Sequence, residues 1–82
     1  MLIMVKWLDI LGEDQNPWSS LEEAKELKPA PITSIGKLLE DNDEYITIAA
    51  SWDDESELVG NVNCIPKGVI REVSRVGVVD PD

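Results

Sequence analysis

ITSIGKLLEDNDEYITIAASW, residues 32–52, contains two strand-like runs separated by a short polar segment. In the second run, Tyr45 to Trp52, the apolar side chains fall on alternate positions, which are Ile46, Ile48, Ala50 and Trp52. This period of two is typical of a strand with one buried face. The first run, residues 32–40, alternates less regularly and contains Gly36, and a glycine inside a strand often marks a bulge or a sharp bend. The stretch therefore predicts an antiparallel hairpin with a bend near Gly36.

Three more strands are expected around this hairpin. One lies before it, at residues 2–11, and two follow it, at residues 60–65 and 69–76. Between the last two, Pro66 and Gly68 predict a single 3₁₀-like turn. Proline fixes φ and cannot donate to a ladder, whereas glycine allows a positive φ.

A short helix is expected between the first two strands. It begins at Ser19 or Ser20, because each serine has a glutamate three residues later, the spacing of a capping box. It ends before Pro29. A helix of roughly two turns is marginal alone, so we expect its apolar stripe to pack on the sheet. This apolar stripe of the helix consists of Leu21, Ala24 and Leu27. Residues 13–17, before the helix, are expected to form a polar loop.

The order of strand, helix and four closely spaced strands predicts one small mainly β (α+β) domain over residues 1–76, with a loose tail at residues 77–82. Five short strands with a single-turn break before the last are typical of SH3-like or Sm-like small β-barrels. Closure of such a barrel hides most strand edges.

Several strings, in this order and spacing, resemble a family of small, mostly uncharacterised proteins of tailed phages and prophages. The matching strings are Val5-Lys6-Trp7-Leu8-Asp9, Trp18 before Ser-Leu-Glu-Glu, Ser34-Ile35-Gly36-Lys37-Leu38-Leu39, Tyr45-Ile46-Thr47-Ile48-Ala49 and Ile65-Pro66-Lys67-Gly68-Val69-Ile70. The resemblance implies a phage origin and a small β-rich fold, and it supplies no catalytic motif. The last string also looks like the turn before the final strand of SH3 domains, although the aromatic cluster that binds proline-rich peptides there has no counterpart.

Composition restricts the chemistry. The 82 residues include no histidine and one cysteine, so Ser-His-Asp and Cys-His catalysis and a Cys/His zinc site are excluded. We therefore expect a non-enzymatic protein without a cofactor or metal. Cys64, beside Ile65, is expected to be a small buried hydrophobe. A secretion signal and an apolar run of about 18 residues are both absent, which favours the host cytoplasm.

Seventeen acidic and seven basic residues give a net charge of −10. This field repels nucleic-acid phosphates and anionic membranes, so it favours a basic protein partner or serves solubility alone. An exposed tryptophan ringed by acids is a good anchor for such a partner. Trp18 either packs in the core or at the helix start, or provides this anchor. The candidate partner-binding residues are Trp18, Asp41, Asp43, Glu44, Asp53, Asp54 and Glu55.

These features predict an acidic protein-interaction module of a phage, which inhibits a nucleic-acid-binding or defence protein of the host. An alternative is an oligomer that sequesters a nucleotide messenger, with the cations Lys37, Lys67, Arg71 and Arg75 gathered near an interface. A second alternative is an accessory protein of the virion. The sequence does not decide between a monomer and a homo-oligomer.

Overall fold

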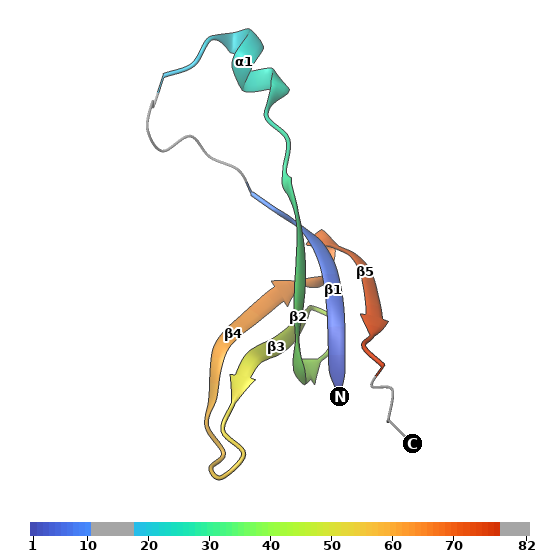
Figure 1. The fold of residues 1–82 in the computed structure, drawn as a ribbon. Coiled ribbons are helices and arrows are strands. Elements are labelled where there is room, and N and C mark those ends of the chain that lie inside the picture. Colours follow the sequence, from blue (N-terminus) through green and yellow to red (C-terminus); the bar gives the residue numbers. More distant parts are fainter. Residues whose placement is uncertain (11–17, 78–82) are drawn as a thin grey trace.

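The computed structural model describes residues 1–10 and 18–77 as one antiparallel sheet with a short helix set apart from it (Figure 1). Its elements are β1 (Leu2–Asp9), α1 (Leu21–Glu26), β2 (Ala30–Asp41), β3 (Tyr45–Trp52), β4 (Val59–Pro66), the 3₁₀ turn η1 (Lys67–Val69) and β5 (Ile70–Arg75). The strand order is β4-β3-β2-β1-β5. In the described part of the chain β4 and β5 do not pair with each other, so the sheet is open at these two edges. The predicted loop at residues 13–17 and most of the predicted tail, residues 78–82, lie outside the described residues.

The β2–β3 hairpin confirms the antiparallel hairpin predicted from residues 32–52. β3 has the predicted bounds, whereas β2 is longer than predicted at both ends. Its register with β3 shifts between Leu38 and Glu40, so the bulge lies after the position expected for it. Gly36 has a different role, because a Cβ atom there would lie 2.7 Å from the carbonyl oxygen of Ala49. Only glycine allows this close approach of two backbones.

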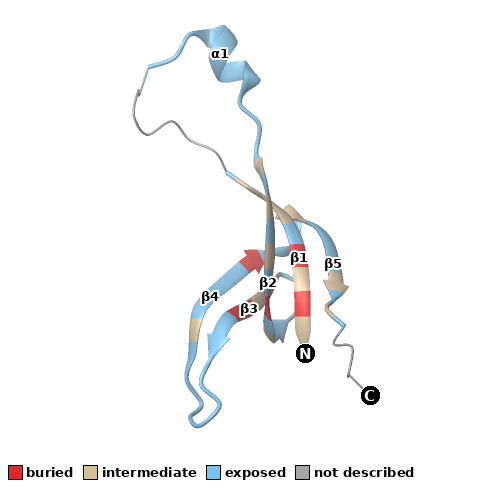
Figure 2. Cartoon of the chain, in the orientation of Figure 1, coloured by how far each residue is buried: buried red, intermediate tan, exposed pale blue. Residues whose placement is uncertain are grey.

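The core of the protein consists of aliphatic residues of this sheet. Its buried residues are Ile3, Val5, Ile46, Ile48 and Ile65, and four partly buried side chains pack against them, namely Trp7, Leu38, Val69 and Ile70 (Figure 2). Burying one such aliphatic side chain contributes about 1.5–3 kcal/mol. Since the buried residues come from β1, β3 and β4, the core joins strands that are distant in sequence.

The 3₁₀ turn before the last strand is confirmed at Lys67–Val69. Gly68 does not use a positive φ there, because the turn is completed in the ordinary right-handed region of backbone space. Among the described residues, only Asn61 has a positive φ, of 52°. Asparagine tolerates this conformation better than most residues, and Asn61 lies within β4, between the paired residues Gly60 and Val62.

The helix α1 begins as predicted, with Ser20 as its N-cap and the Ser20 Oγ accepting a hydrogen bond from the Glu23 N–H at 3.1 Å. The prediction that its apolar stripe packs on the sheet is wrong. No residue of α1 is buried, and Leu21 is 70% exposed. The physical reason is that β1 and β2 stay paired as far as Asp9 and Ala30, so α1 lies beyond the end of the paired strands and away from the core (Figure 1).

Cys64 also departs from the sequence prediction, because it is exposed. It lies on the edge strand β4 and alternates with the buried Ile65, so its side chain leaves the core face. The other strands differ from prediction only at their ends, since β1 stops at Asp9 and β5 spans Ile70–Arg75.

None of the described helices is long and apolar enough to cross a membrane.

Candidate functional site

The β3–β4 hairpin projects from the sheet and ends in an acidic loop (Figure 1). Four of the five residues at 53–57 are acidic. The Asp53 N–H donates to the Leu58 carbonyl oxygen at 3.0 Å, which closes the loop between the two strands. Inside the loop, the Glu55 N–H donates to Asp53 Oδ1 at 2.9 Å and the Leu58 N–H donates to Ser56 Oγ at 3.3 Å. These bonds give the loop a defined shape although its side chains are exposed.

One carboxylate of this loop has a perturbed acidity. The backbone hydrogen bond from Glu55 lowers the pKa of Asp53, and hydrogen bonds from Ser56 lower it further. Both interactions favour the ionised form, because a carboxylate accepts hydrogen bonds more strongly than the neutral acid. The loop therefore keeps a negative charge at Asp53 below the pH at which an ordinary aspartate becomes protonated.

An open groove of about 640 Å³ runs along the base of this loop. Its lining combines apolar and acidic side chains from both strands, namely Ser51, Trp52, Asp53, Asp54, Glu55, Leu58, Val59 and Gly60. A second, smaller depression also has Trp52 and Asp54 in its wall. The apolar side chains of the groove are well exposed, with Trp52 at 40% and Leu58 at 73%. Exposed apolar surface rimmed by charge is typical of a binding surface.

The Trp52 ring already holds one cation. The Lys37 Nζ atom, from the neighbouring strand β2, lies 5.6 Å from the centre of the ring. This is within the range of a cation–π interaction, in which the negative face of the ring attracts an ammonium group. The geometry shows that the Trp52 ring is accessible to a lysine side chain.

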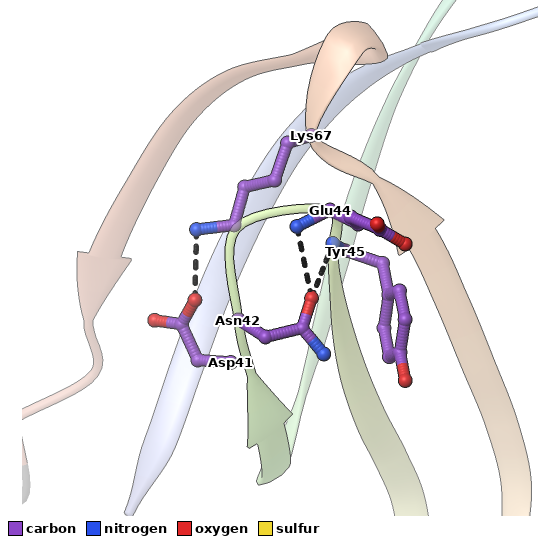
Figure 3. Close-up of polar contacts among 5 residues, drawn as sticks. All are labelled: Asp41, Asn42, Glu44, Tyr45 and Lys67. Carbon is purple, nitrogen blue, oxygen red and sulfur yellow. Dashed lines mark hydrogen bonds and ion pairs between the residues drawn. The ribbon is translucent and has the colours of Figure 1, made fainter.

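Asp41 and Glu44, two of the candidate acidic residues, lie at the β2–β3 turn and make contacts that stabilise the fold (Figure 3). Asn42 Oδ1 accepts hydrogen bonds from the N–H groups of Glu44 and Tyr45, at 2.9 and 3.0 Å. The Asp41 carboxylate lies 2.7 Å from Lys67 Nζ, and the Lys67 N–H donates to the Glu44 carbonyl oxygen at 2.8 Å. Asp41 and Glu44 thus fix η1 against the turn.

The structure does not bring the predicted partner-binding residues together. Asp53, Asp54 and Glu55 share the groove, whereas Asp41, Asp43 and Glu44 lie at the opposite end of β3. Trp18 precedes α1, and α1 and the β3–β4 hairpin lie at opposite ends of the drawn chain (Figure 1). Trp18 is 84% exposed, so it does not lie in the core.

The four cations of the nucleotide-binding alternative have different surroundings. Lys37 lies over Trp52, and Lys67 pairs with Asp41. Arg71 and Arg75 belong to β5, the edge strand farthest from β4 in the sheet. Two of these cations are therefore already bound by neighbours of opposite charge or by an aromatic ring.

Sequence reasoning missed the apolar part of the groove. The alternation from Tyr45 to Trp52 placed Trp52 only on the apolar face of a strand, and Leu58 and Val59 were not singled out. A signal for them exists in the sequence, because Trp52 directly precedes the acidic run and Leu58-Val59 directly follows it. Two strands joined by a six-residue loop place these flanking residues opposite each other, and Trp52 indeed pairs with Val59.

Residues 1–10 and 18–77 contain no group of three or more His, Cys, Asp or Glu side chains placed to hold a metal ion. Comparisons with protein-family models, curated proteins and solved structures found no match. The assignment of a role to this chain therefore depends on the geometry of the β3–β4 hairpin.

Proposed function

We propose that this chain is a non-enzymatic, acidic protein-interaction module that binds a basic protein through its β3–β4 hairpin. The observation that carries the proposal is the position of Lys37 over the ring of Trp52, beside the loop of Asp53, Asp54 and Glu55. A lysine or arginine of a partner would meet the same ring and, in addition, the carboxylates that surround it.

The energetics of such a contact favour a basic partner. The net charge of −10 attracts a positive surface over a long distance and accelerates encounter, although salt screens this effect. Trp52, Leu58 and Val59 then provide apolar area that becomes buried on contact. The charge of the chain attracts and orients the basic partner, and Trp52 provides the local contact that holds a cationic side chain.

The proposal extends to the fold and the biological setting. We propose that the open sheet is a variant of the SH3-like small barrel, which is supported by the antiparallel order with β5 beside β1 and by the 3₁₀ turn before β5. The resemblance to small phage proteins supports a phage accessory protein that acts in the host cytoplasm. Its partner would then be a basic host protein, such as a nucleic-acid-binding or defence protein.

The test is affinity capture from bacterial lysate with the wild-type chain and two variants. The two variants have the same net charge as each other, because each replaces three acidic residues by amides. In the first variant Asp53, Asp54 and Glu55 become Asn, Asn and Gln, and in the second Glu22, Glu23 and Glu26 of α1 all become Gln. We expect a basic protein that binds wild type and the α1 variant at low ionic strength, is lost from the hairpin variant, and is released by salt. Equal capture by both variants would show that only net charge matters, and the hairpin would then have no specific role.

A further inference from the structure

The outer edge of β4 lies next to the groove and has no neighbouring strand in the part of the chain that the structure describes. We propose that this edge accepts an extended, basic segment of the partner protein as an additional strand. This inference rests on the proposed function, because it specifies how the basic partner of the β3–β4 hairpin is held.

The hydrogen-bonding pattern shows which backbone groups are available. At the β2–β3 turn, the Asn42 N–H donates to the Tyr45 carbonyl oxygen at 3.1 Å, so the backbone groups of Tyr45 point towards β2. Successive residues of a strand direct these groups to opposite sides. The N–H and C=O groups of Ile46 and Ile48 therefore point towards β4, where the partner residues are Ile65 and Asn63.

The same alternation directs the backbone groups of the intervening residues of β4 away from β3. The bond from the Lys67 N–H to the Glu44 carbonyl oxygen, 2.8 Å long, fits the alternation. Cys64 and Val62 lie opposite Thr47 and Ala49, so their N–H and C=O groups point away from β3. These outward groups form a short acceptor edge that runs from Val62 to Pro66 and ends there because proline has no N–H.

The side chains of this edge do not protect it. Native edge strands are commonly blunted by charged residues, especially lysine, or are covered by another element. β4 contains no charged residue, and Ile65 is its only buried one. Val62 is 49% exposed and Val59 is 44% exposed. The edge is therefore both open and apolar enough to pair with a further strand.

Charge identifies the occupant. A second copy of this chain would have the same net charge of −10 and would be repelled at long range. A segment with lysine or arginine side chains would be attracted, and the end of β4 next to the hairpin would place them beside Trp52, Asp53 and Asp54. At the other end of β4, Lys67 is already paired with Asp41. The edge thus favours a segment whose positive charge lies at its hairpin end.

The probe for this inference is a blocked synthetic peptide of about eight residues that alternates lysine and valine, the pattern of a strand with one apolar face. A matched peptide has methyl groups on alternate backbone nitrogens, which removes hydrogen-bond donors and keeps all charges. We expect the methylated peptide to bind about tenfold more weakly. We also expect the amide signals of Val62 and Cys64 to shift in NMR spectra when the first peptide is added.

Two variants test the same point from the side of the protein. Cys64→Pro removes an outward N–H at an edge position, where proline is tolerated, and Cys64→Ala changes only the side chain. We expect about tenfold weaker binding of the lysine–valine peptide by Cys64→Pro and unchanged binding by Cys64→Ala. If Cys64→Pro fails to fold, as judged by circular dichroism, the methylated peptide still decides.

The outcomes separate the two proposals. If both peptides bind alike and neutralising the hairpin carboxylates still weakens them, the edge inference is wrong and the proposed function stands. If the lysine–valine peptide does not bind at all, the edge does not accept basic strands. A dimer of the free chain that Cys64→Pro converts to a monomer would show that a second copy occupies the edge, which also overturns the inference.

Discussion

Lys37 lies with its ammonium nitrogen 5.6 Å from the centre of the Trp52 ring, and Trp52 is one of the residues that line the groove. A cationic side chain of the partner would compete with Lys37 for the same ring. We therefore expect Lys37→Met to strengthen binding of the lysine–valine peptide roughly two- to fivefold, the range that corresponds to an exposed cation–π contact. Fluorescence titration or calorimetry measures this change.

The matched control for this prediction is Lys28→Met, which changes the net charge by the same amount outside the sheet. If Lys28→Met strengthens binding as much as Lys37→Met does, net charge explains the gain and Trp52 is not the binding point.

Gly36 and Ala49 give a prediction about stability. A Cβ atom at position 36 would lie 2.7 Å from the Ala49 carbonyl oxygen, and backbone atoms cannot move aside as a flexible side chain can. We expect Gly36→Ala to lower the free energy of unfolding by about 1–3 kcal/mol, the usual cost of overpacking a core. Urea denaturation followed by circular dichroism measures it.

Gly68 provides the comparison for this variant, because a Cβ atom there meets nothing within 4 Å and its φ is not positive. Gly68→Ala is expected to be neutral or to stabilise the chain by about 0.4–1 kcal/mol through the unfolded state. Equal destabilisation by both variants would mean that the close approach of β2 and β3 has no special weight.

The elements that the sequence predicts well are those with local signals. The alternation from Tyr45 to Trp52 defines β3, the Ser20–Glu23 spacing defines the start of α1, and Pro66 precedes η1. In each case the physical cause lies within a few residues of its effect. The mainly β fold follows from these elements.

The features that the sequence does not predict depend on contacts between distant residues. The exposure of Cys64 follows from the position of β4 at the edge of the sheet. The order of strands in a sheet cannot be predicted from the sequence of any single strand. The exposure of α1 follows from the length of the β1–β2 pairing up to Asp9 and Ala30. The candidate site was predicted only in part, because Asp53 to Glu55 were identified while the contact between Trp52 and Lys37 joins residues of different strands.

Trp7 and Ser34 form a third testable contact between strands. The indole N–H of Trp7 donates to Ser34 Oγ at 3.0 Å in a partly buried position. Trp7→Phe keeps an aromatic ring but removes this donor, so we expect a loss of about 0.5–1.5 kcal/mol in the free energy of unfolding. Since Trp7 also packs on the core, part of the loss reflects the smaller ring.

A double-mutant cycle with Ser34→Ala isolates the hydrogen bond from the change in packing. The coupling between the two positions is expected to be roughly 0.5 kcal/mol or more. Strictly additive effects in urea denaturation would show that the hydrogen bond contributes nothing to stability.

Asp53 makes stability depend on pH. Hydrogen bonds from Glu55 and Ser56 hold its pKa below the ordinary value in the folded chain, and the unfolded chain lacks them. A carboxyl group whose pKa is lower in the folded state stabilises the fold above its unfolded pKa, and this contribution is lost as the pH falls through the folded pKa. Asp53→Ala is therefore expected to be less stable than wild type at neutral pH, with a difference that shrinks in acid below the ordinary aspartate pKa.

Thermal unfolding of wild type, Asp53→Ala and Asp54→Ala across this acidic range measures the effect. Asp54→Ala removes the same charge from the adjacent position, so it controls for repulsion within the acidic loop. NMR titration of the Asp53 carboxyl carbon in wild type and in Ser56→Ala is expected to show a higher pKa in the variant, since Ser56 stabilises the ionised form. A constant stability difference at every pH, or a deficit equal to that of Asp54→Ala, would mean that the hydrogen bonds to Asp53 do not link the loop to protonation. The hydrogen bonds to Asp53 would then shape the loop without making the stability of the fold depend on pH.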